Sequence, residues 1–211
     1  MMKIKRYELP PIGTNAWLLY DEDRGEALLC DAPLEAWERI MPDLKELGCE
    51  LKAVLITHGH WDHIGDGHHF SRTGVPIYAH ESDGPMMARP SAQMNPSIQG
   101  CKADHTLKDG DSLELLGQEI AVKHVPGHSP GSVLFYFSEL KWAISGDVIF
   151  RGTVGRTDFP GCSHIQLINS IRKHILTLPE ETVLYPGHGG RTTVAIEKRD
   201  NPFLKDLGPL S

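Results

Sequence analysis

The 211-residue sequence has no run of about 18 apolar residues, so it offers no candidate membrane-spanning helix. Its N-terminus is basic, but no apolar stretch follows, and a signal peptide is therefore not predicted. The four cysteines are widely spaced and form no Cys-x-x-Cys pair. In a chain without an export signal, this favours free thiols and a cytoplasmic location.

An excess of basic residues is also missing, since the formal net charge is -7. A nucleic-acid-binding protein needs a basic face that neutralises phosphates, so nucleic acid is not expected as a partner. Hydrophobic residues make up 40% of the chain and charged residues 23%, which is ordinary for a globular protein. Histidine is the residue in excess: there are twelve, and this number invites a search for metal ligands.

Strand-like and helix-like segments alternate along the chain, and strands outnumber helices. The apolar period predicts helices at Leu34–Leu47, Ile64–Thr73, Glu81–Ala88, Ile165–Leu178 and Thr193–Lys198. Strands are predicted at Lys3–Tyr7, Asn15–Tyr20, Ala27–Cys30, Lys52–Ile56, Pro76–Ala79, Leu113–Leu116, Glu119–Val125, Val133–Phe137, Trp142–Ser145 and Thr182–Tyr185. Residues 89–106 show no clear period and are expected to form a loop near a site. Two packed sheets with helices on their outer faces, within one domain, satisfy this pattern.

The most informative motif is His58-Gly59-His60-Trp61-Asp62-His63, which follows a predicted strand. Alternate residues of an extended segment point the same way, so His58 and His60 can converge on one ion. Asp62 and His63 lie beyond the turn and would face a second ion nearby. Four ligand-type residues crowded this closely fit two metals better than one, because a catalytic zinc ion keeps only three protein ligands.

Three further ligand-type residues stand in a shared context. They are His128, Asp147 and His188, each of which comes just after a predicted strand and directly follows a glycine. Glycine permits a close approach of the backbone. This recurrence indicates a site gathered at one edge of a sheet sandwich.

Together these motifs resemble the metallo-β-lactamase superfamily over nearly the whole chain, and within it the single-domain glyoxalase II-like (hydroxyacylglutathione hydrolase-like) proteins. The resemblance implies an α/β fold, a four-layer αββα sandwich, and two divalent metal ions, with zinc expected and iron or manganese as alternatives. It implies that His58, His60 and His128 hold the first metal. Asp62, His63 and His188 would hold the second, and Asp147 would bridge both. Residues 1–211 would form one such domain, without the C-terminal helical substrate domain of true glyoxalase II.

These ligands suit the hydrolysis of a thioester. Two adjacent ions lower the pKa of a shared water from about 15.7 to near 7, and one ion can polarise the substrate carbonyl. A thiolate with a parent pKa near 8.5 leaves without a strong acid. The expected function is therefore binuclear hydrolysis of a small-molecule thioester such as S-lactoylglutathione by a metal-bound hydroxide. Asp62 and Asp147 are the expected catalytic residues, and Asp62 would orient the hydroxide.

Departures from the relatives narrow the function. Lactamases of this superfamily commonly carry Cys or Ser where Asp147 stands, which argues against antibiotic hydrolysis. Glyoxalase II has an aromatic residue just after its last ligand, where this chain has Gly189-Gly190-Arg191. Recognition of glutathione therefore stays open, and a smaller or different thioester is an alternative.

The segment Arg151–Phe159 follows Asp147 closely and is expected to overhang the site. Arg156 could bind an anionic substrate group bidentately, and an ion pair with Asp158 is the alternative. The Gly-Arg-Thr-Asp-Phe stretch also resembles persulfide dioxygenases, in which the positions matching His58, His128 and Asp147 hold one iron ion. That reaction is the second candidate function. A third, a fold that only binds a partner, is disfavoured by the complete set of seven ligand-type residues.

Overall fold

The computed structural model describes residues 1–90 and 98–205 and contains two six-stranded sheets. The first sheet pairs its strands in sequence order: β1 (Lys3–Leu9), β2 (Thr14–Asp21), β3 (Glu26–Cys30), β4 (Glu50–Leu55), β5 (Ile77–His80) and β6 (His105–Leu107). The second runs in the order β14 (Thr192–Thr193), β13 (Val183–Pro186), β10 (Trp142–Gly146), β9 (Val133–Phe137), β8 (Gln118–His124) and β7 (Ser112–Leu115). A small hairpin, β11 (Ile149–Phe150) and β12 (Thr153–Val154), follows β10. The helices are α1 (Ala36–Leu47), α2 (Trp61–Ile64), α3 (Gly67–Ser71), α4 (Gly84–Ala88), α5 (His164–His174) and α6 (Val194–Asp200), with 3₁₀ turns η1 (Glu81–Asp83) and η3 (Pro202–Leu204).

Side-chain alternation along the strands builds the layers. In β2, Leu18 packs towards α1 and α3, whereas Leu19 packs between the two sheets. The second sheet alternates in the same way: Phe135 of β9 joins the layer between the sheets, and Leu134 faces α5 and α6. Each such fully buried side chain stabilises the fold by about 1.5–3 kcal/mol.

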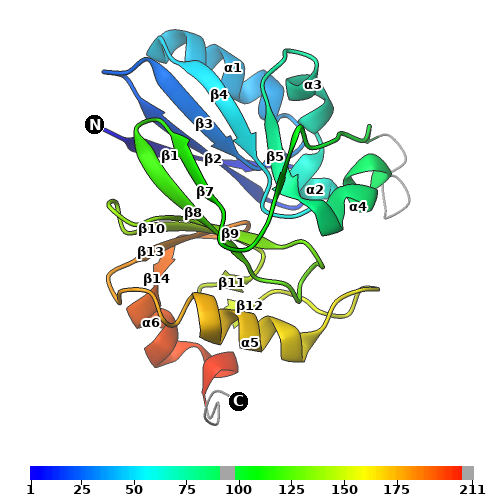
Figure 1. Cartoon of the computed structure of the whole chain (residues 1–211), viewed down its shortest axis with the longest axis vertical. Helices are drawn as coiled ribbons and strands as arrows, with labels where there is room; N and C mark the ends of the chain where they lie inside the picture. The colour runs from blue at the N-terminus through cyan, green and yellow to red at the C-terminus, as the bar shows by residue number, and fades with distance from the viewer. Residues whose placement is uncertain (91–97, 206–211) are drawn as a thin grey trace.

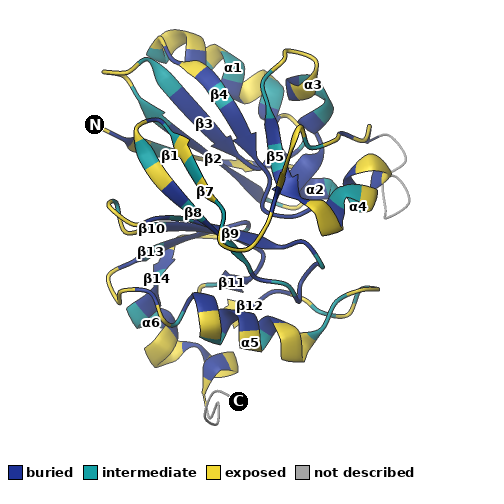
Figure 2. Cartoon of the chain, viewed as in Figure 1, coloured by how far each residue is buried: buried dark blue, intermediate teal, exposed yellow. Residues whose placement is uncertain are grey.

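The layers therefore run helix, sheet, sheet, helix, which confirms the predicted αββα sandwich (Figure 1). Figure 2 shows the strands mostly buried, while the outward faces of α1, α5 and α6 are exposed. None of the helices within residues 1–90 and 98–205 is both long and apolar enough to cross a membrane.

Three predicted segments were wrong in detail. The expected helix Ile64–Thr73 is instead α2 and α3, broken between them. The break falls at Asp66, whose backbone (φ -102°, ψ 7°) is not helical. The backbone of Ala32 bonds both the His63 carbonyl and the Asp66 N–H, so these two groups do not make the hydrogen bonds of a continuous helix. Within the expected loop 89–106, residues 91–97 lie outside the described part, and His105 already begins β6, which pairs with β5. The fourth predicted helix also ends earlier, at His174.

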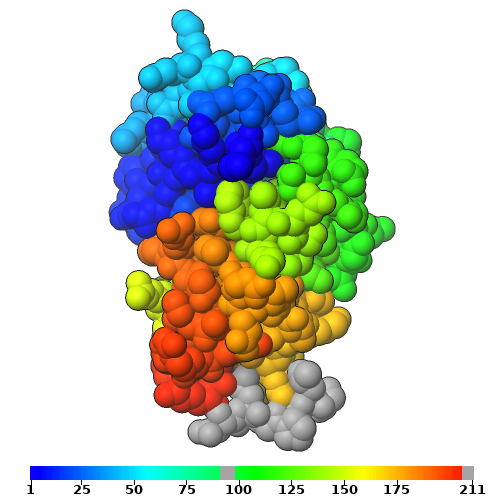
Figure 3. Space-filling view, turned by 90° about the vertical axis from the view of Figure 1, so that its left-hand side faces the viewer, coloured from blue at the N-terminus to red at the C-terminus, as the bar shows by residue number. Residues whose placement is uncertain are grey.

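Each sheet comes from one half of the chain. The first uses residues 3–107 and the second residues 112–193, and Figure 3 shows the two halves at opposite ends of the molecule. Parallel pairs, β3 with β4 in the first sheet and β10 with β13 in the second, bring carboxyl ends of strands to a common edge. The loops that carry the ligand-type residues begin at these ends.

Candidate metal centre

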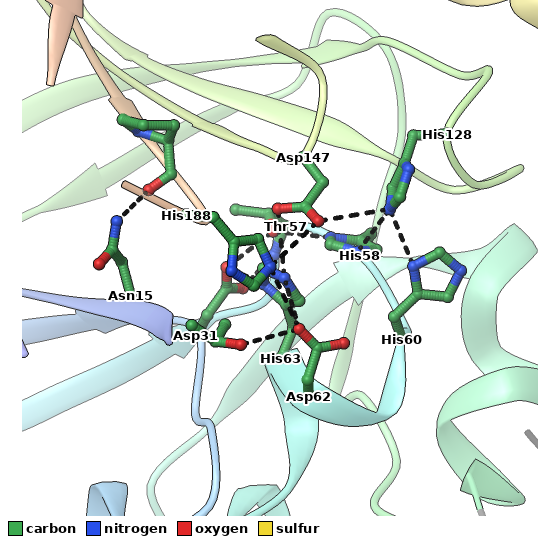
Figure 4. A network of polar contacts seen from close by, with 12 residues as sticks. Asn15, Asp31, Thr57, His58, His60, Asp62, His63, His128, Asp147 and His188 are labelled. Carbon is green, nitrogen blue, oxygen red and sulfur yellow. Dashed lines mark hydrogen bonds and ion pairs between the residues drawn. The ribbon is translucent and has the colours of Figure 1, made fainter. Parts of the chain in front are cut away.

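The seven ligand-type side chains meet where the two sheets face each other at this edge (Figure 4). The first sheet contributes His58 and His60 after β4, and Asp62 and His63 on α2. The second sheet contributes the remaining three, which follow β8, β10 and β13: His128, Asp147 and His188. The structure thus brings together all seven residues singled out from the sequence.

A first group consists of His58, His60 and His128. The Nε2 atom of His128 lies 2.9 Å from Nδ1 of His60 and 3.2 Å from Nε2 of His58. One ring nitrogen of each residue therefore points to a common spot, and these three atoms lie within 4.8 Å of one another. Three imidazole nitrogens in this arrangement match the donor set of a zinc site.

In His128 and His58, the hydrogen bond made by Nδ1, the ring nitrogen that faces away from this common spot, fixes the tautomer. A carbonyl oxygen only accepts, so His128 donates Nδ1–H to the Arg156 carbonyl, 2.8 Å away. The Thr57 hydroxyl donates to Asp31 and so accepts from Nδ1 of His58 at 3.1 Å. In the neutral rings, both Nε2 atoms then carry lone pairs that face each other. Such a pair of atoms repels unless a cation lies between them.

A second group consists of Asp62, His63 and His188. Nε2 of His63 lies 3.3 Å from a carboxylate oxygen of Asp62, and Nε2 of His188 lies 3.4 Å from the same oxygen. Both rings again donate their remote N–H outward, His63 to Asp31 at 2.7 Å and His188 to the Gly13 carbonyl at 3.2 Å. Their Nε2 atoms are therefore left for the interior of the site.

Asp147 lies between the two groups (Figure 4). One of its oxygens is 3.3 Å from Nε2 of His63, and the other is 3.6 Å from Nε2 of His128. Within the described part of the chain, Oδ1 of Asp147 and Nε2 of His63 are buried without a hydrogen-bond partner. Unpaired buried polar atoms are costly, and two of them aimed at one point fit a bound cation. The residues present therefore fit the metal that the donor set indicates.

The electrostatics of the two groups differ. Burial lowers the pKa of His58 well below its usual value, and neighbouring imidazoles, His63 first, lower it further. Burial likewise lowers the pKa of His60 to about 4. His58 and His60 are thus held as neutral imidazoles that are ready to bind a metal ion.

In the second group, burial opposes charge, but the carboxylates outweigh it. Asp62 and Asp147 raise the pKa of His63 well above its usual value, and the same two raise the pKa of His188 to about 9. Burial alone would raise the pKa of the Asp147 carboxyl, but His63 and His188 hold that pKa well below its usual range. This half of the site demands positive charge, which a proton or a metal ion can supply.

Sequence reasoning missed the residues that hold the ligands in place. Asp31 accepts from the backbone N–H and hydroxyl of Thr57 and from His63, so it orients both groups at once. Thr14 donates its hydroxyl to Asp62 at 2.8 Å, and the backbone N–H of Asn15 donates to Gly187 beside His188. Asp31 had a readable signal, because it directly follows the strand β3 just as Asp147 follows β10. The roles of the other residues depend on partners far away in sequence.

Close packing explains two of the glycines beside ligands. A Cβ on Gly187 would lie 2.1 Å from Oδ1 of Asp147 and 2.6 Å from the His63 ring. A Cβ on Gly146, whose φ is +48°, would lie 2.5 Å from the Thr57 hydroxyl. Both positions therefore require glycine if the ligands are to keep their places.

Arg156 lies at the rim of the first group. Its guanidinium stacks on the Phe159 ring at 4.6 Å, and that ring packs against His60 with centroids 5.6 Å apart. The structure pairs the guanidinium with Asp158 through two hydrogen bonds of 3.0 and 2.8 Å. Both side chains of this pair are about two-thirds exposed, at 67% and 65%, so a ligand can reach them.

The fold and this site define a class of protein, the metal-dependent hydrolases of the αββα sandwich. The family model described as the metallo-beta-lactamase superfamily matches residues 9–188, and the chain belongs to that superfamily. Its fold implies divalent metal ions, and the His and Asp clusters stand where they would bind.

Two curated relatives cover almost the whole chain. The "Probable metallo-hydrolase YqgX" of Bacillus subtilis is 36% identical over 96% of this chain and 98% of its own length. The "Hydroxyacylglutathione hydrolase GloC" of Haemophilus influenzae is 37% identical, again over 96% and 98%.

Solved structures with the same fold carry different descriptions. The BLEG-1 B3 metallo-beta-lactamase has a TM-score of 0.90 at 37% identity, covering 96% of this chain and all of that one. TTHA1623 in a di-iron-bound form has a TM-score of 0.82 at 36% identity, covering 95% of this chain and all of that one. ETHE1 from Myxococcus xanthus has a TM-score of 0.79 at 29% identity, covering 95% and 83%. The fold alone therefore does not choose the substrate.

Proposed function

We propose that this protein is a binuclear metal-dependent hydrolase that cleaves a small-molecule thioester such as S-lactoylglutathione. The observation that carries the proposal is the convergence of seven ligand-type side chains on two adjacent points that share Asp147. His58, His60 and His128 would hold the first ion, and Asp62, His63 and His188 the second. The relative named hydroxyacylglutathione hydrolase supports the choice of a thioester.

Divalent ions bound here would supply Lewis acidity and hydroxide at neutral pH. The protein's own contribution is positioning and charge. Asp147 presents Oδ1 to His63 and Oδ2 to both His128 and His188. Asp62, fixed by Thr14, has an oxygen aimed at the interior with which it can orient the attacking water's proton. A thiolate leaving group needs no protein acid.

Arg156 is proposed as the contact for an anionic group of the substrate. Its planar fork already holds a carboxylate, that of Asp158, in the bidentate geometry that a substrate carboxylate would use. Its stacking on Phe159, which touches His60, places that contact beside the first group. Exchange of Asp158 for a substrate carboxylate would cost little, because the exposed pair is weak.

Zinc is the proposed metal, since a set of imidazole and carboxylate donors suits it. The same donors also suit iron and manganese, and a similar solved structure is in a di-iron form. A cytoplasmic location and a small-molecule substrate, with no nucleic acid or membrane partner, complete the proposal. The four cysteines are free thiols in the structure, which supports a reducing compartment.

A mononuclear iron persulfide dioxygenase is the second candidate. The Arg156–Phe159 segment, which resembles that class, lies directly on the site: the Arg156 carbonyl holds His128, and Phe159 packs on His60. His58, His128 and Asp147 would then hold one iron ion. We prefer the binuclear hydrolase because all three ligand-type residues of the second group are brought together, and this group includes the carboxylate that a second cation needs.

The test combines metal content by mass spectrometry with assays on the purified full chain. About two equivalents of metal with thiol release from S-lactoylglutathione would support the proposal. About one equivalent of iron, with oxygen uptake on glutathione persulfide and no thiol release, would replace it with the dioxygenase. If the protein hydrolyses a chromogenic β-lactam faster than it acts on S-lactoylglutathione or glutathione persulfide, both proposed functions would be overturned. That result would point to the activity named for the BLEG-1 structure.

A further inference from the structure

Asp83 is a buried carboxylate, 1% exposed, that lies outside the seven ligand-type residues. It ends η1, just before α4, and among the described residues its carboxylate accepts hydrogen bonds from two distant loops. Its Oδ2 accepts from the backbone N–H of Gly59 at 2.8 Å and from the hydroxyl of Ser129 at 2.7 Å, and its Oδ1 accepts from the backbone N–H of Gly131 at 2.7 Å. One side chain thus joins the loop of His58 and His60 to the loop of His128.

Two glycines pack closely against the side chain of Asp83. A Cβ on Gly131 would lie 2.6 Å from Cγ of Asp83, and a Cβ on Gly59 would lie 3.0 Å from its Cβ. A side chain at either position would push the carboxylate away. Glycine at both contacts is therefore an independent sign that the two loops are closed onto Asp83.

We propose that Asp83 is a positioning residue that sets the distance between these loops and thereby the metal affinity of the first group alone. The inference rests on the metal assignment of the proposed function. Selectivity follows because the Asp83 carboxylate bonds, in the part of the chain that the structure describes, only to the loops of the first group, whereas the second group is held by the Gly13 carbonyl, by Thr14 and by Asp31. Asp31 also reaches the first group through Thr57 and stays in place in the Asp83 variants. Without Asp83, the Gly59 and Gly131 amides would lose charged acceptors, and His60 and His128 would no longer be held together.

The experiment measures zinc retention by the full chain against a chromophoric chelator. Asp83→Ala should weaken one of two zinc ions about 10- to 100-fold, the usual effect of losing a residue that supports a ligand, and leave the other unchanged. Asp83→Asn should have a smaller effect, because its oxygen can keep Gly59 and Ser129 while only the Gly131 N–H loses its acceptor. If Asp83→Ala does not fold, the Asn variant decides.

Two backgrounds identify which ion is affected. In a His188→Ala protein, which keeps the first group, Asp83→Asn should weaken the remaining zinc. In a His60→Ala protein, the same change should have no effect on the zinc of the second group. Asp104→Asn is the matched control: its carboxylate accepts the Ile77 N–H at 2.9 Å between β5 and β6, and its loss should leave both ions bound.

Wild-type affinity for both ions in the Asp83 variants, or equal weakening of both, would overturn the role of Asp83. A wild-type protein that binds no second ion would instead overturn the binuclear function. In that case the effect of Asp83→Asn on the remaining ion would still decide the present inference.

Discussion

Asp147 reaches both groups of the site. Asp147→Ala should lower thioester cleavage by about 10³-fold or more and reduce bound metal, because its two oxygens lie 3.3 Å from Nε2 of His63 and 3.6 Å from Nε2 of His128. The chain should stay folded, since the side chain makes few contacts with the core. Thiol release, metal content and circular dichroism measure the three effects, and a fully active variant would contradict the site assignment.

Gly187 tests the packing of the ligands rather than their chemistry. Gly187→Ala should remove metal and activity, because its Cβ would overlap Asp147 and the His63 ring. Gly190→Ala, in the same loop, has nothing within 4 Å of the new Cβ and should behave as wild type. Metal content of the two variants gives the comparison, and equal binding by both would show that the loop can relax.

Arg156 can be tested through the charge of the substrate. Arg156→Ala should raise KM for an anionic thioester about tenfold and leave KM for a neutral one nearly unchanged, because one exposed charge-assisted contact is lost. Steady-state kinetics on a matched pair of thioesters separates the two. Equal changes for both substrates would leave Arg156 with the ion pair to Asp158 as its only role.

At the scale of single residues, the sequence predicted the ligand-type residues but not the residues that hold them in place by hydrogen bonds. Three of the former follow a strand and a glycine, and the other four crowd into residues 58–63, so a single sequence displays both signatures. Asp83 and Thr14 have no such signature, because Thr14 meets Asp62 48 positions away and Asp83 meets Gly131 at the same separation. Only the packing of the two sheets reveals these pairs.

At the scale of elements, α6 fastens the hairpin β11–β12 beside the site. The fully buried Glu197 accepts from the Thr192 hydroxyl, from the Gly152 N–H and from Asn201. The Phe150 ring of this hairpin packs against His188, with centroids 6.1 Å apart. The helix therefore supports the second group through the hairpin.

Glu197→Ala should lower the free energy of unfolding of the metal-free protein by about 3 kcal/mol, because buried donors lose their acceptor. Glu197→Gln should cost much less, since its oxygen can serve Gly152 and Asn201 while its amide donates to Thr192. Urea unfolding measures both. Similar losses for the two variants would show that the negative charge itself is needed.

The elements with strong apolar alternation were predictable, and the exceptions have local causes. Ten of the twelve strands in the two described sheets lie close to their expected positions, because each buries one or both faces, whereas β6 and β14 were not predicted. The helix expected at Ile64–Thr73 is broken because the backbone of Ala32 takes the hydrogen bonds of His63 and Asp66, a contact about which periodicity says nothing. The strand β6 was missed because three residues are too few to show a period.

For the whole molecule, the site makes stability depend on pH when metal is removed. Burial opposes the charge of His188, but Asp147 and Asp62 raise its pKa to about 9, above about 6.5 in an unfolded chain. A raised folded-state pKa contributes stability that is fully present below pH 6.5 and lost as the pH rises through about 9. The Tm of chelator-treated protein should therefore fall across this window. His188→Gln should flatten the fall, and an unchanged slope in that variant would assign it to other groups.

The sequential origin of the two sheets has a consequence for assembly. A cut in the turn at residues 108–111 would leave each fragment with one complete sheet and an incomplete set of ligands: His58, His60, Asp62 and His63 on one, His128, Asp147 and His188 on the other. Each fragment would expose the apolar face that normally meets its partner. Because neither fragment has the full set of ligands, tight metal binding would require the two fragments to associate. Metal would therefore stabilise the complex of the fragments, and metal affinity would measure their association.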